Sequence, residues 1–382
     1  MLMGGDGAGR HPMPRPAIGD AGLTRPDWTT PLERDPALLW LDKNENGDPA
    51  MADLVAGLLA GLDPGILSTY PELTGLYHLL ADHVGVDPSM IVVTGGADGG
   101  IRSVFDAFVS PGDAVLRLEP TYAMYDVYGR IYGARQIVVD YRASTEGPVL
   151  DLDALHSTLA SEAPRLVCLP NPASPTGTVL DLGELVSIAE AVARHGGVLL
   201  VDEAYHPFDP ITAVPLLVDH PNLVVVRTFS KAWALSGLRI GYCVADPDLT
   251  RLLHKVRPGY ETNFVAVRMA EAVLAEEEAM LRSVARLNDG RDRFVGEMAD
   301  LGFRTLPSGG NFLLVEFGDY APKVHRVLED LVLYRRDFGH PSLAGFSRFS
   351  ATTADRFVPV VARIRTVIGD GQVTSARASD DL

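Results

Sequence analysis

Short runs of β-branched and aliphatic residues alternate along the chain with longer stretches whose apolar positions recur at helical spacing. The first pattern is typical of buried strands and the second of amphipathic helices. Their regular alternation predicts an α/β fold in which crossover helices join parallel strands. The predicted strands are Met90–Thr94, Ala114–Leu118, Arg135–Val139, Arg165–Leu169, Gly197–Val201, Leu223–Thr228 and Gly237–Val244.

These strands predict one large, mixed and mostly parallel seven-stranded sheet. The predicted helices are Leu73–Val84, Gly99–Phe108, Thr121–Gly133, Asp151–Ala160, Asp181–His195 and Asp248–Lys255. After Asn263 a long helical stretch continues to about Leu301, and strand-like runs follow at Asn311–Phe317 and Phe346–Ala351. This change of pattern predicts a second, smaller α+β domain. We expect an N-terminal arm over residues 1–40, a large domain over 41–264, a small C-terminal domain over 265–370 and a frayed tail over 371–382.

Composition restricts the class of protein. With 382 residues, 47% of them hydrophobic and 22% charged, most of the chain is expected to pack into a core. The net charge of −17 would repel nucleic acids and anionic lipids. There is no apolar run of the ~20 residues that a membrane helix needs, nor a signal-peptide pattern, so a cytoplasmic protein without nucleic acid or membrane partners is expected.

Neither the cysteines nor the histidines predict a metal site. The two cysteines, Cys168 and Cys243, lie in apolar strand-like runs and are expected to be buried free thiols. The ten histidines show no ligand spacing.

Polar residues follow three of the predicted strands, at the ends where open α/β sheets bind ligands. The loops are N-P-A-S-P-T-G at 171–177, D-E-A-Y at 202–205 and T-F-S-K at 228–231. The chain contains only four lysines, Lys43, Lys231, Lys255 and Lys323, and one of them ends the third loop.

Pyridoxal phosphate matches this set of residues. Its aldehyde needs a lysine, its ring nitrogen a carboxylate and its phosphate an arginine with hydroxyl or amide donors. The chain offers Lys231 for the aldehyde, Asp202 for the ring nitrogen, and Arg239 with Ser230 for the phosphate.

The chain resembles the fold-type-I pyridoxal-phosphate aminotransferases (class I/II), in their histidinol-phosphate aminotransferase branch. The resemblance covers Leu41 to about Ile368, and the motifs follow the family's order. Besides the three loops they are L-D-K-N-E-N at 41–46, Tyr70-Pro71-Glu72, G-G-A-D at 95–98, P-T-Y at 120–122, Arg239, Asn311-Phe312 and Arg348.

The resemblance implies a role for each of these positions. Lys231 would bind the cofactor covalently, Asp202 would pair with the ring nitrogen, and Lys231, Asp202 and Tyr205 would be the catalytic residues. The other implied cofactor contacts are Asn171 and Tyr205 at the ring hydroxyl, Tyr122 stacked on the ring, and Ala97, Asp98, Thr228, Ser230 and Arg239 at the phosphate. Tyr70 would reach the phosphate from the partner subunit of a homodimer. The implied substrate-binding residues are Arg348, Arg336, Asn44 and Asn311.

The chain departs from the family pattern at several positions. No tyrosine precedes Tyr70, so the arm tyrosine that helps to hold the substrate's phosphate in relatives is missing. The acid that usually follows G-A-D is Gly99, and the usual P-Y-N loop is replaced by residues 258–263.

We therefore expect an aminotransferase that moves an amino group between an amino acid and a 2-oxo acid in a ping-pong mechanism through Lys231. Glu45, Asp48 and Glu261, on loops expected at the substrate entrance, favour a donor with a polar or cationic side chain. Histidinol-phosphate aminotransferase is the first alternative. A pyridoxal-phosphate lyase, decarboxylase or cyclase on the same fold is the second.

Overall fold

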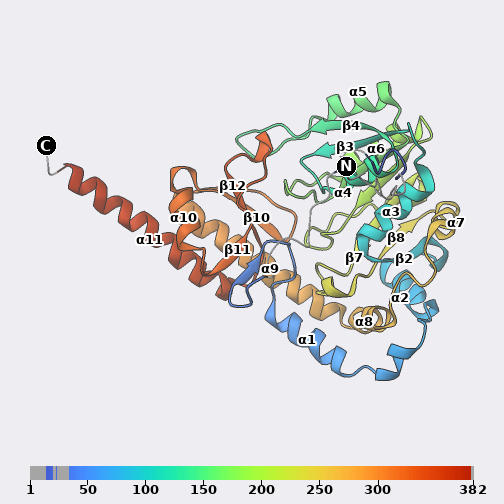
Figure 1. Cartoon of the computed structure of the whole chain (residues 1–382), viewed down its shortest axis with the longest axis horizontal. Coiled ribbons are helices and arrows are strands. Elements are labelled where there is room, and N and C mark those ends of the chain that lie inside the picture. The colour runs from blue at the N-terminus through green and yellow to red at the C-terminus, as the bar shows by residue number, and fades with distance from the viewer. Residues whose placement is uncertain (1–13, 20–22, 24–33, 380–382) are drawn as a thin grey trace, which may run out of the picture.

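The structure is a computed structural model that describes residues 14–19, 23 and 34–379, so most of the expected N-terminal arm lies outside the described residues. Its largest element is a seven-stranded sheet with the order β2-β8-β7-β6-β5-β3-β4 (Figure 1). The strands are β2 (Ile91–Thr94), β3 (Ala114–Glu119), β4 (Arg135–Asp140), β5 (Leu166–Pro170), β6 (Val198–Asp202), β7 (Leu223–Thr228) and β8 (Gly241–Ala245). Only β8 runs antiparallel to its neighbours, which confirms the predicted mixed, mostly parallel sheet.

Helices cover both faces of this sheet. They are α1 (Pro49–Ala60), α2 (Thr74–Val84), α3 (Gly96–Phe108), α4 (Met124–Ile131), α5 (Leu152–Glu162), α6 (Leu182–Ala193), α7 (Pro247–Val256) and α8 (Phe264–Leu274). Val167 and Leu169 of β5 pack into one hydrophobic cluster, while Leu166 and Cys168 pack into another on the opposite face. A strand that is buried on both faces needs apolar residues at every position, which explains the continuous apolar runs of the central strands.

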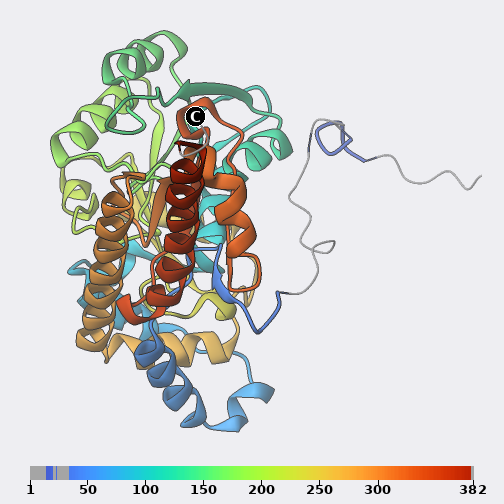
Figure 2. The ribbon, with the colours of Figure 1, turned by 90° about the vertical axis from the view of Figure 1, so that its left-hand side faces the viewer.

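A smaller α+β body packs beside the sheet, as expected (Figures 1 and 2). Its strands are β9 (Arg304–Leu306), β10 (Phe312–Glu316) and β12 (Phe346–Ser350) in one antiparallel sheet, with β1 (Leu39–Leu41) parallel to β11 (Val332–Tyr334) in another. Its helices are α9 (Glu277–Asp300), α10 (Ala321–Val327) and α11 (Ala354–Ser379). Helix α9 joins the two bodies, since Leu287 packs in the core of the larger one and Phe294 in that of the smaller one.

Several boundaries differ from those predicted. The helical stretch after Asn263 is two helices, α8 and α9, and α11 continues to Ser379, beyond the start of the expected frayed tail. Strand β8 begins at Gly241, because Ser236–Leu238 forms a 3₁₀ turn and Arg239 has a φ of +54°. Helix α1 and the short strands β1, β9 and β11 were not predicted. Since β1 pairs with β11, the chain before α1 contributes to the smaller body.

The topology brings the predicted loops to one edge of the large sheet. Strands β5, β6 and β7 are parallel and end at Pro170, Asp202 and Thr228. Strand β2 shares their direction, because both β2 and β7 are antiparallel to β8. The start of α3, which follows β2, therefore lies at the same edge as the three loops.

Candidate active site

A cavity of about 1140 Å³ opens between the two bodies and contains most of the candidate catalytic and substrate residues. Its lining comes from three parts of the chain. The segment after β1 contributes Asp42, Lys43 and Asn44; the large sheet and its loops contribute Arg117, Glu119, Tyr122, Asp126, Arg130, Ser174, Tyr205 and Lys231; the smaller body contributes Arg335, Phe338 and Arg348.

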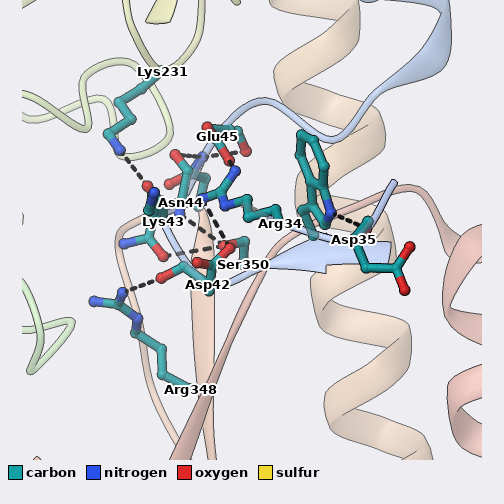
Figure 3. Close-up of polar contacts among 11 residues, drawn as sticks. Arg34, Asp35, Asp42, Lys43, Asn44, Glu45, Lys231, Arg348 and Ser350 are labelled. Atoms are coloured by element: carbon teal, nitrogen blue, oxygen red, sulfur yellow. Dashed lines mark hydrogen bonds and ion pairs between the residues drawn. The ribbon is translucent and has the colours of Figure 1, made fainter. Parts of the chain in front are cut away.

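Lys231 extends from the loop after β7 toward the segment after β1 (Figure 3). Its Nζ donates a hydrogen bond to the Lys43 carbonyl oxygen at 2.7 Å. Burial lowers the pKa of Lys231; the positive charges of Arg348 and Arg239 act in the same direction, while Tyr205 and Glu45 oppose them. A lowered pKa favours the neutral amine, the form that attacks a carbonyl or accepts a proton.

Asp202 ends β6 and is 6% exposed. Its Oδ2 accepts a hydrogen bond from Tyr125 Oη at 2.8 Å, and its Oδ1 accepts one from the Ala204 N–H at 3.1 Å. Burial raises the pKa of Asp202 to about 6, although both hydrogen bonds favour the charged form. A cationic partner would relieve this cost of desolvation. No sequence motif marks Tyr125, which lies three residues after Tyr122.

Three further predicted residues surround this region. Tyr205 is 8% exposed, and its Oη accepts a hydrogen bond from Asn44 Nδ2 at 2.8 Å. The side chain of Asn171 binds the backbone of Leu180 through both its oxygen and its nitrogen, at 2.8 and 3.1 Å. The Tyr122 ring lines the cavity, and its hydroxyl donates to Asp98 at 3.2 Å.

The start of α3 and the loop after β7 form a cradle of hydrogen-bond donors. Thr228 Oγ1 donates to Ser230 Oγ at 2.9 Å, and Arg239 donates to the same Ser230 oxygen at 3.3 Å. A Cβ atom added to Gly96, where φ is +80°, would lie 3.0 Å from the Arg239 guanidinium. The first N–H groups of a helix have no partner within it, so those of Ala97 and Asp98 are available as anion-binding donors at the start of α3.

These groups fit pyridoxal phosphate. The phosphate needs cationic and N–H donors, which Arg239, Ser230 and the start of α3 provide together. The ring nitrogen needs a carboxylate, and Asp202 is a buried one whose charge lacks a cationic partner among the described residues. The aldehyde needs the amine of Lys231.

Arg348, on β12, is 8% exposed and approaches the cavity from the smaller body (Figure 3). One guanidinium nitrogen donates to the Asp42 carbonyl at 2.9 Å and another to Ser174 Oγ at 3.4 Å, whereas the buried Nε has no partner among the described residues. Burial lowers the pKa of Arg348, although an arginine stays charged. A carboxylate or phosphate would satisfy this guanidinium.

Two other expected substrate contacts, Arg336 and Asn311, do not line this cavity. The guanidinium of Arg336 lies over the ring of Tyr334, 5.5 Å from the ring centroid. Arg335 lines the cavity instead; its backbone pairs with that of Arg348, which places both side chains on the same face. Asn311 is buried, and its side chain donates a hydrogen bond to the Asn44 carbonyl at 2.9 Å. Asn311 therefore contacts the residue that binds Tyr205.

The three acids expected at the substrate entrance do not line the cavity. Glu45 pairs with Arg34 at 2.8 Å, and the buried Asp48 caps α1 and accepts from Arg286 Nε at 3.0 Å. Glu261 binds the Gly95 N–H at the start of α3. In the structure these three acids therefore give no support to the expected polar or cationic donor.

Tyr70 is 70% exposed and lies outside this cavity, with its ring stacked on Tyr260 at a centroid distance of 4.1 Å. Among the residues that the structure describes, no group of three or more His, Cys, Asp or Glu is arranged to hold a metal ion. In the same part of the chain no helix is long and apolar enough to cross a bilayer.

The fold and the site together define a fold-type-I pyridoxal-phosphate enzyme. Residues 39–364 match the aminotransferase class I and II family, so the chain belongs to that family. The chain is 33% identical over 317 residues to histidinol-phosphate aminotransferase 1 of Carboxydothermus hydrogenoformans, covering 82% of this chain and 88% of the relative. It is 35% identical over 339 residues to the histidinol-phosphate aminotransferase of Sodalis glossinidius, covering 86% and 90%.

Among solved structures, histidinol-phosphate aminotransferase from Sinorhizobium meliloti in complex with pyridoxal-5'-phosphate superposes with a TM-score of 0.75. The two sequences are 26% identical, and the match covers 87% of this chain and 91% of that one. These findings confirm the expected family, the fold, the aminotransferase activity and pyridoxal phosphate as the cofactor.

Proposed function

We propose that this aminotransferase acts on a donor that carries an anionic group, of the histidinol-phosphate type, with a 2-oxo acid as the acceptor. The observation that carries this proposal is the charge of the cavity. Lys43, Arg335 and Arg348 line it and form no ion pair with a carboxylate of the described residues. Arg117 and Arg130, by contrast, are paired with Glu119 and Asp126.

Unpaired cations beside a cofactor site attract an anionic substrate and repel a cationic one. The names of the two relatives support the same conclusion, because both are histidinol-phosphate aminotransferases. The missing arm tyrosine removes one expected phosphate contact, and Arg335 offers a cation that lines the cavity.

The positions of the chain's own residues support the following roles. Arg348 and Arg335 bind the anionic group, and Tyr122 covers the cofactor ring. Asp202 keeps the ring nitrogen protonated, and Tyr205, oriented by Asn44, contacts the ring hydroxyl. When bound, the cofactor supplies an aldehyde that takes up the amino group and a ring that withdraws electrons from the substrate's α-carbon. Lys231, as a free amine, would move the α-proton of the substrate as a general base and acid.

We further propose a ping-pong sequence in a homodimer, with Tyr70 directed into the partner's site. Donor alone should then convert the cofactor stoichiometrically into pyridoxamine phosphate and release a keto product. A lyase or decarboxylase would instead release its product without that conversion.

A donor scan in single half-reactions tests the proposal. The loss of the cofactor's absorbance is followed after mixing holoenzyme with histidinol phosphate, glutamate, arginine and leucine at equal concentration. We expect the anionic donors to react faster than arginine by about tenfold or more, since a charge-assisted contact contributes about 1.5–3 kcal/mol. Arginine reacting fastest would overturn the substrate assignment, and turnover without pyridoxamine phosphate would overturn transamination.

A further inference from the structure

Two positions at which the chain departs from its branch, Gly99 and Glu261, lie against each other in the structure. Gly99 is in the first turns of α3, and Glu261 is in the loop between α7 and α8. A Cβ atom added to Gly99 would lie 2.7 Å from Glu261 Oε1. A side chain at position 99 would therefore displace the Glu261 carboxylate.

Glu261 caps α3 from outside the helix. Its Oε1 accepts the N–H of the N-cap residue Gly95 at 2.8 Å. In a capping box the third helical residue accepts this N–H. Here that residue is Asp98, whose carboxylate accepts the hydroxyls of Tyr122 and Tyr128 at 3.2 and 2.9 Å instead. Glu261 thus takes the capping role that Asp98 does not fill.

A chain of polar contacts holds the Glu261 carboxylate in place. Arg257 Nε donates to Glu261 Oε2 at 3.2 Å, and another Arg257 nitrogen donates to Tyr77 Oη at 3.0 Å. The same Tyr77 oxygen accepts the N–H of Val93 in β2 at 3.2 Å. The Arg257 and Glu261 side chains are only 11% and 12% exposed, so solvent screens this ion pair less than a surface pair.

We propose that Glu261 is a positioning residue of the cofactor cradle. By binding the Gly95 N–H it fixes the turn from β2 into α3, so that the following N–H groups of α3 converge on the cofactor's phosphate. Gly99 is the second residue of this arrangement: because it has no side chain, the Glu261 carboxylate can lie against it. The inference rests on the cradle assigned above to α3 and does not depend on the choice of substrate.

Equilibrium binding of pyridoxal phosphate to the apoenzyme, measured without donor or acceptor, tests this proposal. We expect Glu261→Ala to weaken binding about 3- to 30-fold, the range typical of a lost helix cap. Glu261→Gln keeps an oxygen at the same place and should stay within about twofold of wild type. Glu278→Ala is the matched control, because that glutamate side chain is 93% exposed.

The Gly99→Ala variant tests the pairing of the two residues. In the wild-type background its methyl group expels the carboxylate, so cofactor binding should weaken as in Glu261→Ala. In the Glu261→Ala background the same change should cost nothing further. Equal losses from Gly99→Ala in both backgrounds would overturn the pairing.

Two other results would overturn the proposal itself: Glu261→Ala binding the cofactor as Glu278→Ala does, or Glu261→Gln losing as much as Glu261→Ala. The second result would mean that charge, and not the cap, matters. If Glu261→Ala does not fold, Glu261→Asp replaces it, since its shorter carboxylate falls short of the Gly95 N–H. Circular dichroism and melting of each apoenzyme establish that the compared variants are folded. No donor enters these assays, so a wrong substrate assignment leaves their result unchanged.

Discussion

Tyr125 Oη donates a hydrogen bond to Asp202 Oδ2 at 2.8 Å, with the tyrosine completely buried against the large sheet. This bond stabilises the carboxylate, yet burial outweighs it and raises the pKa of Asp202 from 3.8 to about 6. In the apoenzyme the buried charge is a cost to folding, which the protonated ring nitrogen of the cofactor would offset.

The pKa of Asp202 predicts a pH dependence of apoenzyme stability. A raised folded-state pKa means that the folded state holds its proton more tightly than the unfolded state. Stability is therefore lost as the pH rises between about 4 and 6, by about 3 kcal/mol for a shift of roughly two units. We expect apo Asp202→Asn to be more stable than the wild type above about pH 6 and equal to it below about pH 4. Denaturant unfolding across this range measures the difference, and a constant gap at every pH would contradict the prediction.

Lys231 is expected to be the covalent attachment site of the cofactor. Borohydride reduction of the holoenzyme should yield one labelled peptide, containing Lys231, and Lys231→Ala should reduce kcat by about 10²- to 10⁴-fold or more while the protein still folds. Peptide mapping and steady-state kinetics measure these outcomes. The exposed Lys255, changed to alanine, is the control. Recovery of the label on Lys43 would refute the assignment.

The central strands and most helices could be predicted because their patterns are local and repeated. Strands such as β5 are buried on both faces, which leaves a continuous apolar run. Strands β1, β9 and β11 have only three residues each and take their conformation from partners distant in sequence, so no local pattern marks them. The break between α8 and α9 has no proline or glycine to signal it.

The candidate site likewise contains some residues that sequence motifs mark and others that no motif marks. The motifs single out Asp202, at the end of β6, and Lys231, in the loop after β7. They did not identify Tyr125, because a tyrosine in an amphipathic helix is most often a core residue. Nor could adjacent arginines at 335 and 336 be distinguished by composition, since the β-bridge between Arg335 and Arg348 decides which side chain faces the cavity.

Tyr70 is expected to complete the site of a second subunit. It lies outside its own chain's cavity, 70% exposed and stacked on Tyr260. Tyr70→Phe should weaken cofactor retention by about tenfold or more, the contribution of a hydrogen bond to a charged group. Mixed dimers of Tyr70→Phe with Lys231→Ala should recover activity in one of their two sites. Mixed dimers no more active than the separate parents would mean that Tyr70 does not act across the interface.

Arg335 and Arg348 provide the test of substrate binding. Both line the cavity, and the positive charge of Arg335 contributes to the lowered pKa of Arg348. An anionic substrate group would relieve this repulsion and satisfy the unpaired Arg348 Nε. Arg348→Lys should raise KM strongly, because an ammonium group lacks the two-pronged geometry of a guanidinium. Steady-state kinetics and the melting temperature are measured on one preparation of the variant. A purely structural role of Arg348 would lower Tm without a selective rise in KM, whereas a role in substrate binding would raise KM.

A comparison of the adjacent residues Arg335 and Arg336 tests the proposed substrate contact most directly. Arg335→Ala should raise KM for an anionic donor about tenfold or more and leave kcat nearly unchanged. This is the expected result because the charge-assisted contact is made equally in the ground state and in the transition state. Arg336→Ala is the matched control, because Arg336 neighbours Arg335 in sequence but is not among the residues that line the cavity. It should change KM less than about twofold. The reverse outcome, a large KM effect at Arg336 and none at Arg335, would contradict the assignment of Arg335 to the anionic group of the substrate.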